Sequence, residues 1–270
     1  MKIDRVLLSS NSNINYYPYW NPLSKVYREK FGVIPTLIWV GTEQEKNDCG
    51  ISTEYGDVVV VEPNPKYPTS SQCTWSTYWS THLFPNDTCF ICGIDEVPLS
   101  GMFMKDMIAE YSDNSYVMLI ADAYTPDHWS IAGGTSPSGQ HVAKGSTFMR
   151  IYEFENDFKD EIDKVYSSGS LETYLIRNPQ GYQSDHFKWG TDETYFSHKL
   201  RSYIGDEIIS LNNFNLMRDR RIECYRSYET PYDLVKLKDG WYSQVHLCRP
   251  FIDHKDYILK LYSDIGNYNT

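Results

Sequence analysis

The chain has 270 residues, enough to bury one substantial core or two closely joined lobes. Its formal net charge of −11 argues against a duplex nucleic-acid partner, because phosphate backbones are bound through clustered Lys and Arg. The first residues mix charge with apolar side chains, unlike a signal peptide, and no apolar run approaches the roughly twenty residues that cross a bilayer. We therefore expect a cytoplasmic protein without a transmembrane segment.

Strands and helices are predicted to alternate over the first 121 residues. Because several predicted strands are apolar on both faces, they indicate a covered, largely parallel sheet. The expected fold is therefore α/β, with a Rossmann-like, mostly parallel central sheet flanked by helices. The predicted strands are 6–9, 36–40, 57–61, 90–95 and 116–121, and the predicted helices are 23–31, closed by Gly32, 70–83 and 102–111.

The stretch 124–145 is rich in Gly, Pro, Ser and Thr. It is predicted to be a loop, either a wall over the functional site or a surface excursion. Beyond it, helices are expected at 146–154, 157–167, 192–203 and 253–262, with a short strand at 207–211.

Residues 90–99 form an apolar run that ends in two acids, Asp95 and Glu96, followed by Pro98. A short buried strand that delivers a carboxylate to its carboxyl end is suited to hold a metal or a ligand. In an extended segment, the side chains of Asp95 and Glu96 would point to opposite faces. The alternative for Asp95 is a turn residue before the proline.

Four segments in the same order carry a family resemblance: GIDEVPLS at 93–100, VAKGSTF at 142–148, WGTDETYF at 189–196 and HLCRPF at 246–251. Together they resemble the GT-A glycosyltransferases, in particular a small viral and bacterial group of nucleotide-sugar transferases. The resemblance implies an enzyme that moves a hexose or deoxyhexose from a nucleoside diphosphate sugar, with a UDP-sugar favoured, to a carbohydrate acceptor. It also implies one GT-A-like domain over 1–270, in which 1–121 bind the nucleotide-sugar and 122–270 form the acceptor side and supply catalytic residues.

The resemblance implies that Asp95 and His246 hold Mn²⁺ or Mg²⁺. An acidic protein that binds an anionic diphosphate also needs a local cation, which favours a metal. The family pattern is Asp-x-Asp, and Gly93 stands at its first position, so that only Asp95 of the pair remains. The alternative for His246 is a hydrogen-bonded structural histidine.

Asp192 is the expected catalytic base, with Glu193 in reserve, because the resemblance places an acidic motif there. A carboxylate that takes the proton of the acceptor hydroxyl is what an inverting transferase needs. The alternative is that Thr191 or Asp192 caps a helix N-terminus.

Two segments and one arginine are expected to bind the nucleotide-sugar. Ser9, Ser10 and Asn11 follow the first strand, where GT-A folds receive base and ribose. Lys144 and Gly145 would cradle an anion at a helix start, unless Ser146 is only a helix cap. Arg249 would bind the diphosphate, with surface ion pairing as its alternative.

Two other functions stay open on the sequence. A sugar nucleotidyltransferase would carry a glycine-rich basic loop near the first strand, but residues 9–17 contain neither glycine nor lysine. A non-catalytic nucleotide-sugar or glycan-binding protein is the other alternative, because Gly93 interrupts the metal motif. Cys89-x-x-Cys92 has zinc spacing, but it lies within an apolar run without a second pair, so we interpret both cysteines as structural.

Overall fold

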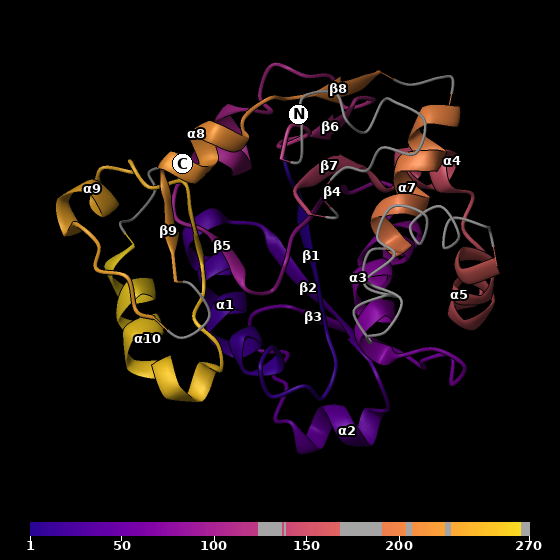
Figure 1. Cartoon of the computed structure of the whole chain (residues 1–270), viewed down its shortest axis with the longest axis horizontal. Helices are drawn as coiled ribbons and strands as arrows, with labels where there is room; N and C mark the ends of the chain where they lie inside the picture. The colour runs from indigo at the N-terminus through magenta and orange to yellow at the C-terminus, as the bar shows by residue number, and fades with distance from the viewer. Residues whose placement is uncertain (124–136, 138, 168–190, 204–206, 225–227, 266–270) are drawn as a thin grey trace, which may run out of the picture.

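The computed structural model describes residues 1–123, 137, 139–167, 191–203, 207–224 and 228–265 (Figure 1). Its central feature is a seven-stranded sheet in which all strands but β7 run parallel to one another. This confirms the expected α/β class with a mostly parallel central sheet. In spatial order the strands are β3 (Asp57–Val61), β2 (Ile34–Val40), β1 (Arg5–Ser10), β4 (Thr88–Ile91), β7 (His141–Lys144), β6 (Tyr116–Met118) and β8 (Ile208–Ser210).

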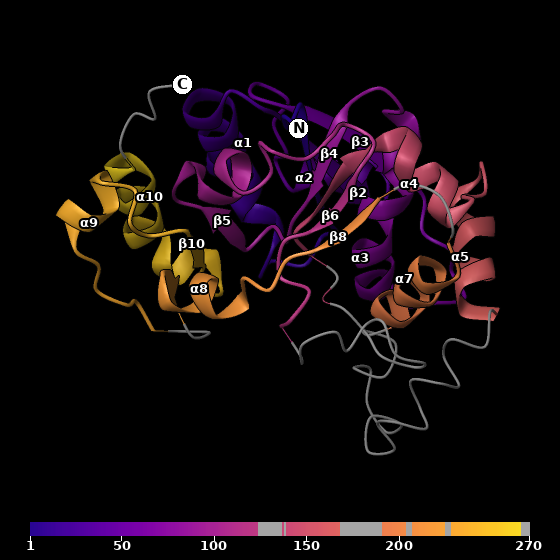
Figure 2. The same cartoon turned by 90° about the horizontal axis from the view of Figure 1, so that it is seen from above.

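Helices cover both faces of this sheet because its strands are apolar on both faces (Figures 1 and 2). Successive residues of a strand point to opposite faces, so Leu7 and Leu8 enter two different cores. One core contains side chains of α1 (Trp20–Val26) and α10 (Lys255–Asp264). The other core contains side chains of α3 (Thr69–Trp79), α4 (Gly145–Tyr152), α5 (Phe158–Ser167) and α7 (Thr191–Ser202).

A second, three-stranded sheet packs beside the central one and was not expected from the sequence. In it, β10 pairs antiparallel with β5 and parallel with β9. Each strand has three residues, too few for a hydrophobic period to be recognised. The strands are β5 (Glu96–Pro98), β10 (Gln244–His246) and β9 (Arg221–Glu223), and the short helices α8 (Phe214–Asp219) and α9 (Leu234–Lys238) belong to the same region.

Most predicted helices are confirmed, but three other expectations change. The strand expected to end at Asp95 ends at Ile91, and the helix expected over 102–111 is a five-residue turn, Met102–Asp106. The expected loop 124–145 ends in strand β7, and its residues 124–136 and 138 lie outside the described residues. Within the described residues, no helix has both the length and the apolar character to span a membrane.

The short helix α2 (Glu43–Asp48) begins with a reciprocal capping box. The Glu45 backbone N–H donates to Thr42 Oγ1 at 3.1 Å, and Glu45 Oε2 accepts from the Thr42 backbone N–H at 2.7 Å. We expect Thr42→Ala to lower the free energy of unfolding by about 1 kcal/mol, because one helix N–H loses its acceptor. Urea unfolding of Thr42→Ala beside Thr42→Ser, which keeps the hydroxyl, checks this. Equal losses in both variants would contradict a capping role.

Candidate active site

A pocket lies where the strand order of the central sheet reverses. From β1 the chain proceeds to β2 and β3 on one side, whereas β4 lies on the other side. Ligands of α/β sheets bind outside the carboxyl ends of the strands at such a point. A cavity of about 540 Å³ opens there. Its polar lining includes Ser9, Ser10, Asn11, Asn13, Asn15 and Tyr16 after β1, Ser70, Thr74 and Thr77 on α3, and Asp95, Glu96, Glu193, His246 and Arg249.

A tight turn after β4 brings two acids to this pocket. The backbone N–H of Glu96 donates to the carbonyl of Gly93 at 3.1 Å. The expectation that Asp95 and Glu96 point to opposite faces assumed an extended chain and is wrong, because both line the pocket. A Cβ at position 93 would lie 3.1 Å from Asp95 Oδ1, so Gly93 gives the Asp95 carboxylate room.

The small sheet aligns three ionisable side chains in one row. His246 on β10 is the register partner of Glu96 on β5 and of Glu223 on β9. Arg221 lies two residues before Glu223, so it shares the same face. Neither Glu223 nor Arg221 was among the residues predicted for the site.

His246 connects two carboxylates. Its Nδ1 lies 2.7 Å from Glu223 Oε1, and its Nε2 lies 3.4 Å from Asp95 Oδ2. Burial opposes a charge on His246, but the hydrogen bonds to the two carboxylates outweigh it and raise the pKa of His246 to about 9. The imidazole is therefore cationic at neutral pH in this arrangement.

The two carboxylates that face His246, Asp95 and Glu223, are held in their ionised form. Burial opposes ionisation of Asp95, but the hydrogen bond and charge of His246, together with Arg249, lower the pKa of Asp95. The same balance applies to Glu223. Burial opposes its ionisation, but the His246 hydrogen bond and the charge of Arg221 outweigh burial and lower the pKa of Glu223.

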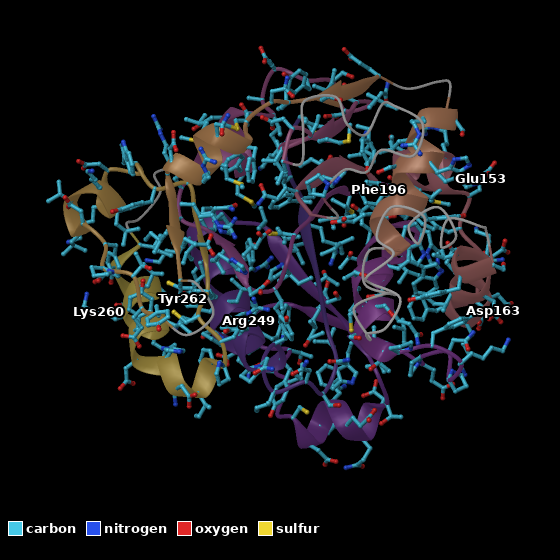
Figure 3. The ribbon with its side chains drawn as sticks, viewed as in Figure 1. Glu153, Asp163, Phe196, Arg249, Lys260 and Tyr262 are labelled. Carbon is cyan, nitrogen blue, oxygen red and sulfur yellow. The ribbon has the colours of Figure 1, made fainter. Side chains whose placement is uncertain are left out.

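Two arginines pair with these acids, and of the two only Arg249 lines the pocket. Arg221 Nη2 lies 3.2 Å from Glu96 Oε1, and Arg221 Nε lies 3.0 Å from Glu223 Oε2. Arg249 Nη1 lies 3.6 Å from Asp95 Oδ2, and it also donates to the hydroxyl of Tyr16. Figure 3 shows the labelled Arg249 between the C-terminal region and the strands of the central sheet. The pocket thus carries fixed cations beside its acids.

Asp95 and His246 fit two positions of a metal site, where a bound ion would displace the Nε2 proton of His246. Their facing atoms are 3.4 Å apart, close to the roughly 3 Å that separates neighbouring ligands of an octahedral ion with bonds of about 2.1 Å. Glu223 holds the other imidazole nitrogen, as outer-shell carboxylates do for metal-bound histidines. Among the described residues, no group of three or more His, Cys, Asp and Glu has the arrangement of a metal site.

The residues after β1 line the other end of the pocket. Ser9, Ser10 and Asn11 are all in its wall, as a nucleoside-binding role requires. Asn11 Nδ2 donates to Thr69 Oγ1 at 3.0 Å, which ties this loop to the first turn of α3. Thr77 also lines the pocket, and its hydroxyl donates to the carbonyl of Thr74 at 3.0 Å, which leaves the hydroxyl oxygen available as an acceptor.

Lys144 and Gly145 lie at the opposite edge of the sheet and do not line this pocket. Because β7 runs antiparallel to β4, Lys144 pairs with Thr88 at the amino end of β4. A Cβ at position 145 would come within 2.2 Å of the Phe84 carbonyl oxygen. Close backbone packing explains the glycine, and the predicted anion cradle lies away from this pocket.

The two candidate bases lie in the first turn of α7. Glu193 lines the pocket, whereas the side chain of Asp192 lies outside the described part of the structure. The cysteines at zinc spacing are separated by the sheet: Cys89 enters one core and Cys92 the other. Burial raises the pKa of the Cys92 thiol well above its ordinary value, in keeping with a structural thiol.

No known protein family and no curated protein matches this sequence. Solved structures are similar to it, and two glycosyltransferases are among them. The glycosyltransferase GlyE of Streptococcus pneumoniae TIGR4 aligns with 79% of this chain and 46% of its own, at 11% identity and a TM-score of 0.38. The apo structure of the bifunctional glycosyltransferase WbbM aligns with 98% of this chain and 50% of its own, at 9% identity and a TM-score of 0.41. The chain thus spans about half the length of the chains it matches, and such low TM-scores establish no shared activity.

Proposed function

We propose that the protein is a glycosyltransferase that moves a hexose or deoxyhexose from a nucleoside diphosphate sugar, with a UDP-sugar favoured, to a glycan acceptor. One observation carries the proposal: the pocket at the switch point joins a neutral polar end, after β1, to a charged end that holds Asp95, His246 and Arg249. A nucleotide diphosphate has the same division into a neutral nucleoside and an anionic diphosphate. The four segments that resemble GT-A enzymes contribute several of these residues.

In the proposed reaction, the acceptor oxygen attacks the anomeric carbon while the bond from that carbon to the diphosphate breaks. Arg249 binds the diphosphate and keeps its charge close to Asp95 and the Tyr16 hydroxyl. Asp95 and His246 would hold Mn²⁺ or Mg²⁺, which when bound offsets the charge that develops on the leaving group. Asp192 takes the acceptor proton, with Glu193 as the alternative, and the reaction inverts the anomeric centre.

A non-catalytic nucleotide-sugar-binding protein is the second candidate. It is favoured by the closed contacts of His246, whose two nitrogens both face carboxylates. In such a protein the same cations would bind the diphosphate without turnover.

A donor screen tests the proposal. We expect one class among UDP-, GDP-, CMP- and dTDP-sugars to raise the melting temperature, to do so more strongly with Mn²⁺, and to release its nucleotide slowly by hydrolysis. His246→Ala should remove the Mn²⁺ dependence, because it removes one proposed ligand and the partner of Asp95. His198→Ala, on the exposed side of α7, is the matched control.

Each outcome of the screen is decisive. Stabilisation without nucleotide release, even with a panel of glycan acceptors, would favour the binding protein. No response to any donor would overturn the glycosyltransferase proposal.

A further inference from the structure

We propose that Glu96 recognises hydroxyl groups of the transferred sugar, and that Arg221 and Gln140 hold it in position. The inference rests on the proposed function. It assigns the donor sugar to a class: neutral sugars that present free hydroxyls to Glu96, in contrast to sugars with a carboxylate at that place.

The pocket has a direction along the edge of the central sheet. At one end lie Ser9, Ser10 and Asn11 after β1, and Arg249 joins this end through its bond to Tyr16. At the other end, Glu96 Oε2 lies 3.7 Å from the place of a Cβ on Gly139, in the segment that leads into β7.

The charged contacts lie between these ends. Arg249 forms an ion pair with Asp95, and Asp95 in turn faces His246. A nucleotide-sugar with its nucleoside after β1 and its diphosphate at Arg249 would therefore extend its sugar toward Glu96. Glu96 then contacts the part of the donor that differs between sugars.

The carboxylate of Glu96 is fixed but retains acceptor capacity. Oε1 is paired with Arg221 Nη2 at 3.2 Å, and Oε2 is 3.5 Å from Gln140 Nε2, the outer limit of a hydrogen bond. The side chain of Glu96 is 24% exposed and lines the pocket. An ionised carboxylate accepts about four hydrogen bonds, so sugar hydroxyls can donate to its remaining positions.

Gln140 is a buried support that the surrounding structure holds in an unusual conformation. It is 1% exposed and adopts a φ of 64°, in the left-handed region that few residues other than glycine occupy. Its backbone N–H donates to the Ile91 carbonyl at 2.7 Å, and its Nε2 donates to Gln244 Oε1 at 2.8 Å. Such backbone conformations cluster at binding sites, where neighbouring contacts enforce them.

The amide oxygen of Gln140 is available to a further donor. Gln140 Oε1 is buried and has no hydrogen-bond partner within the described residues. The same amide group lies beside the pocket carboxylate of Glu96. Buried polar atoms of folded proteins are nearly always paired, so a donor from a ligand or its water would complete this group.

The charge of Glu96 sets which sugars are accepted. Hydroxyl groups donate to a carboxylate, whereas the carboxylate of a uronic acid would be placed against a like charge. We therefore expect the protein to bind a nucleotide hexose more tightly than the matching nucleotide uronic acid, and Glu96→Gln to reduce this preference.

Calorimetric binding separates the sugar from the nucleotide. The ligands are the nucleotide-sugar that stabilises the protein most in the donor screen and its nucleoside diphosphate, both with Mn²⁺. For Glu96→Gln we expect the affinity for the nucleotide-sugar to fall about tenfold, while the affinity for the diphosphate changes less than about twofold. Glu54→Gln, an exposed acid outside the pocket, is the matched control and should change neither.

A second variant guards against a general structural effect. Arg221→Lys keeps the positive charge but loses the guanidinium fork, so it should weaken nucleotide-sugar binding in the same selective way and to a smaller extent. Melting temperatures of both variants show whether they fold.

The failure of the inference is distinguishable from that of the proposed function. If the unaltered protein binds the nucleoside diphosphate but Glu96→Gln weakens both ligands equally, or neither, Glu96 does not read the sugar and the inference is overturned. If the unaltered protein binds neither ligand, the proposed function itself fails.

Discussion

Replacing Asp95 with alanine is expected to lower kcat/KM for donor turnover by about 10³-fold, the effect of losing one electrostatic group at a reacting centre. Asp95 is the carboxylate shared by His246 and Arg249, so its loss leaves both cations without their partner in the pocket. The effect should fall mainly on kcat, because charge on the leaving group develops in the transition state. Initial rates of nucleotide release, measured across Mn²⁺ concentrations, check this.

Two further variants sharpen this test. Asp95→Asn keeps the size of the side chain and loses its charge, and it should be nearly as impaired as the alanine variant. Asp106→Ala removes an exposed acid that does not line the pocket and should behave as the unaltered protein. If the rate of Asp95→Asn stays within about threefold of that of the unaltered protein, the charge of Asp95 is not needed. Losing a required charged group at a reacting centre would lower the rate far more.

The second large effect that we expect is a loss of stability at acid pH, caused by protonation of His141. His141 is 1% exposed, and burial lowers the pKa of His141 to about 4, although its bond to the Pro137 carbonyl raises it in part. The Pro137 oxygen can only accept, so Nε2 carries the proton and Nδ1 accepts from the Tyr116 hydroxyl at 2.9 Å. A second proton on Nδ1 would remove that bond and place a charge among aromatic rings.

The direction of this pH dependence follows from proton binding to His141. Between pH 6.5 and 4 the unfolded chain binds a proton at residue 141 and the folded chain does not, so stability falls as the pH falls through this window. The full loss is about 3 kcal/mol, from 1.36 kcal/mol for each pKa unit. Urea unfolding at pH 4.5 to 7 should show this slope.

The variant His141→Gln separates the contribution of His141 to this pH dependence from that of other titratable groups. It keeps polar atoms at the site but cannot take up the proton, so its unfolding free energy should vary much less between pH 4.5 and 6.5. His246 does not interfere in that window, because its pKa is raised and the stability it adds is lost only as the pH rises from 6.5 through about 9. The exposed His198→Gln is the control. A slope in His141→Gln equal to that of the unaltered protein would contradict this account.

Long apolar segments made the central sheet predictable. β2 and β3 are five to seven residues of mostly apolar, often β-branched side chains, and they form where the pattern predicted strands. The carboxyl end of β1 then follows from strand direction, which is why Ser9, Ser10 and Asn11 were found. Periodicity therefore predicted the half of the pocket that the parallel strands build.

The charged half depended on pairing that no local pattern reveals. Arg221 meets Glu96 across 125 positions of the chain, and Glu223 meets His246 across 23. Their strands hold three residues each and are defined by their partners. The alternation of charged and apolar residues at 221–223 was the available signal, but a three-residue pattern has little statistical weight.

Lys144 and Gly145 show that a local motif can suggest a place in the pocket that the residues do not occupy. The segment around them resembled an anion-binding loop, but strand direction decides at which edge of the sheet a loop lies. Because β7 is antiparallel to β4, the residues after it emerge at the amino end of β4, away from the pocket. A local motif carries no information about that direction.

The place of β7 between β4 and β6 also has a consequence for biosynthesis. The first 121 residues contain β1 to β4 and β6. However, β4 and β6 do not pair with each other, and only β7, at residues 141–144, connects them in the sheet. A nascent chain that has emerged only as far as β6 exposes the hydrogen-bonding edge of β4, which is open to pairing with other chains. We expect fragments that stop before β7 to aggregate. The ribosome must release more than half of the chain before β7 can pair with β4 and β6.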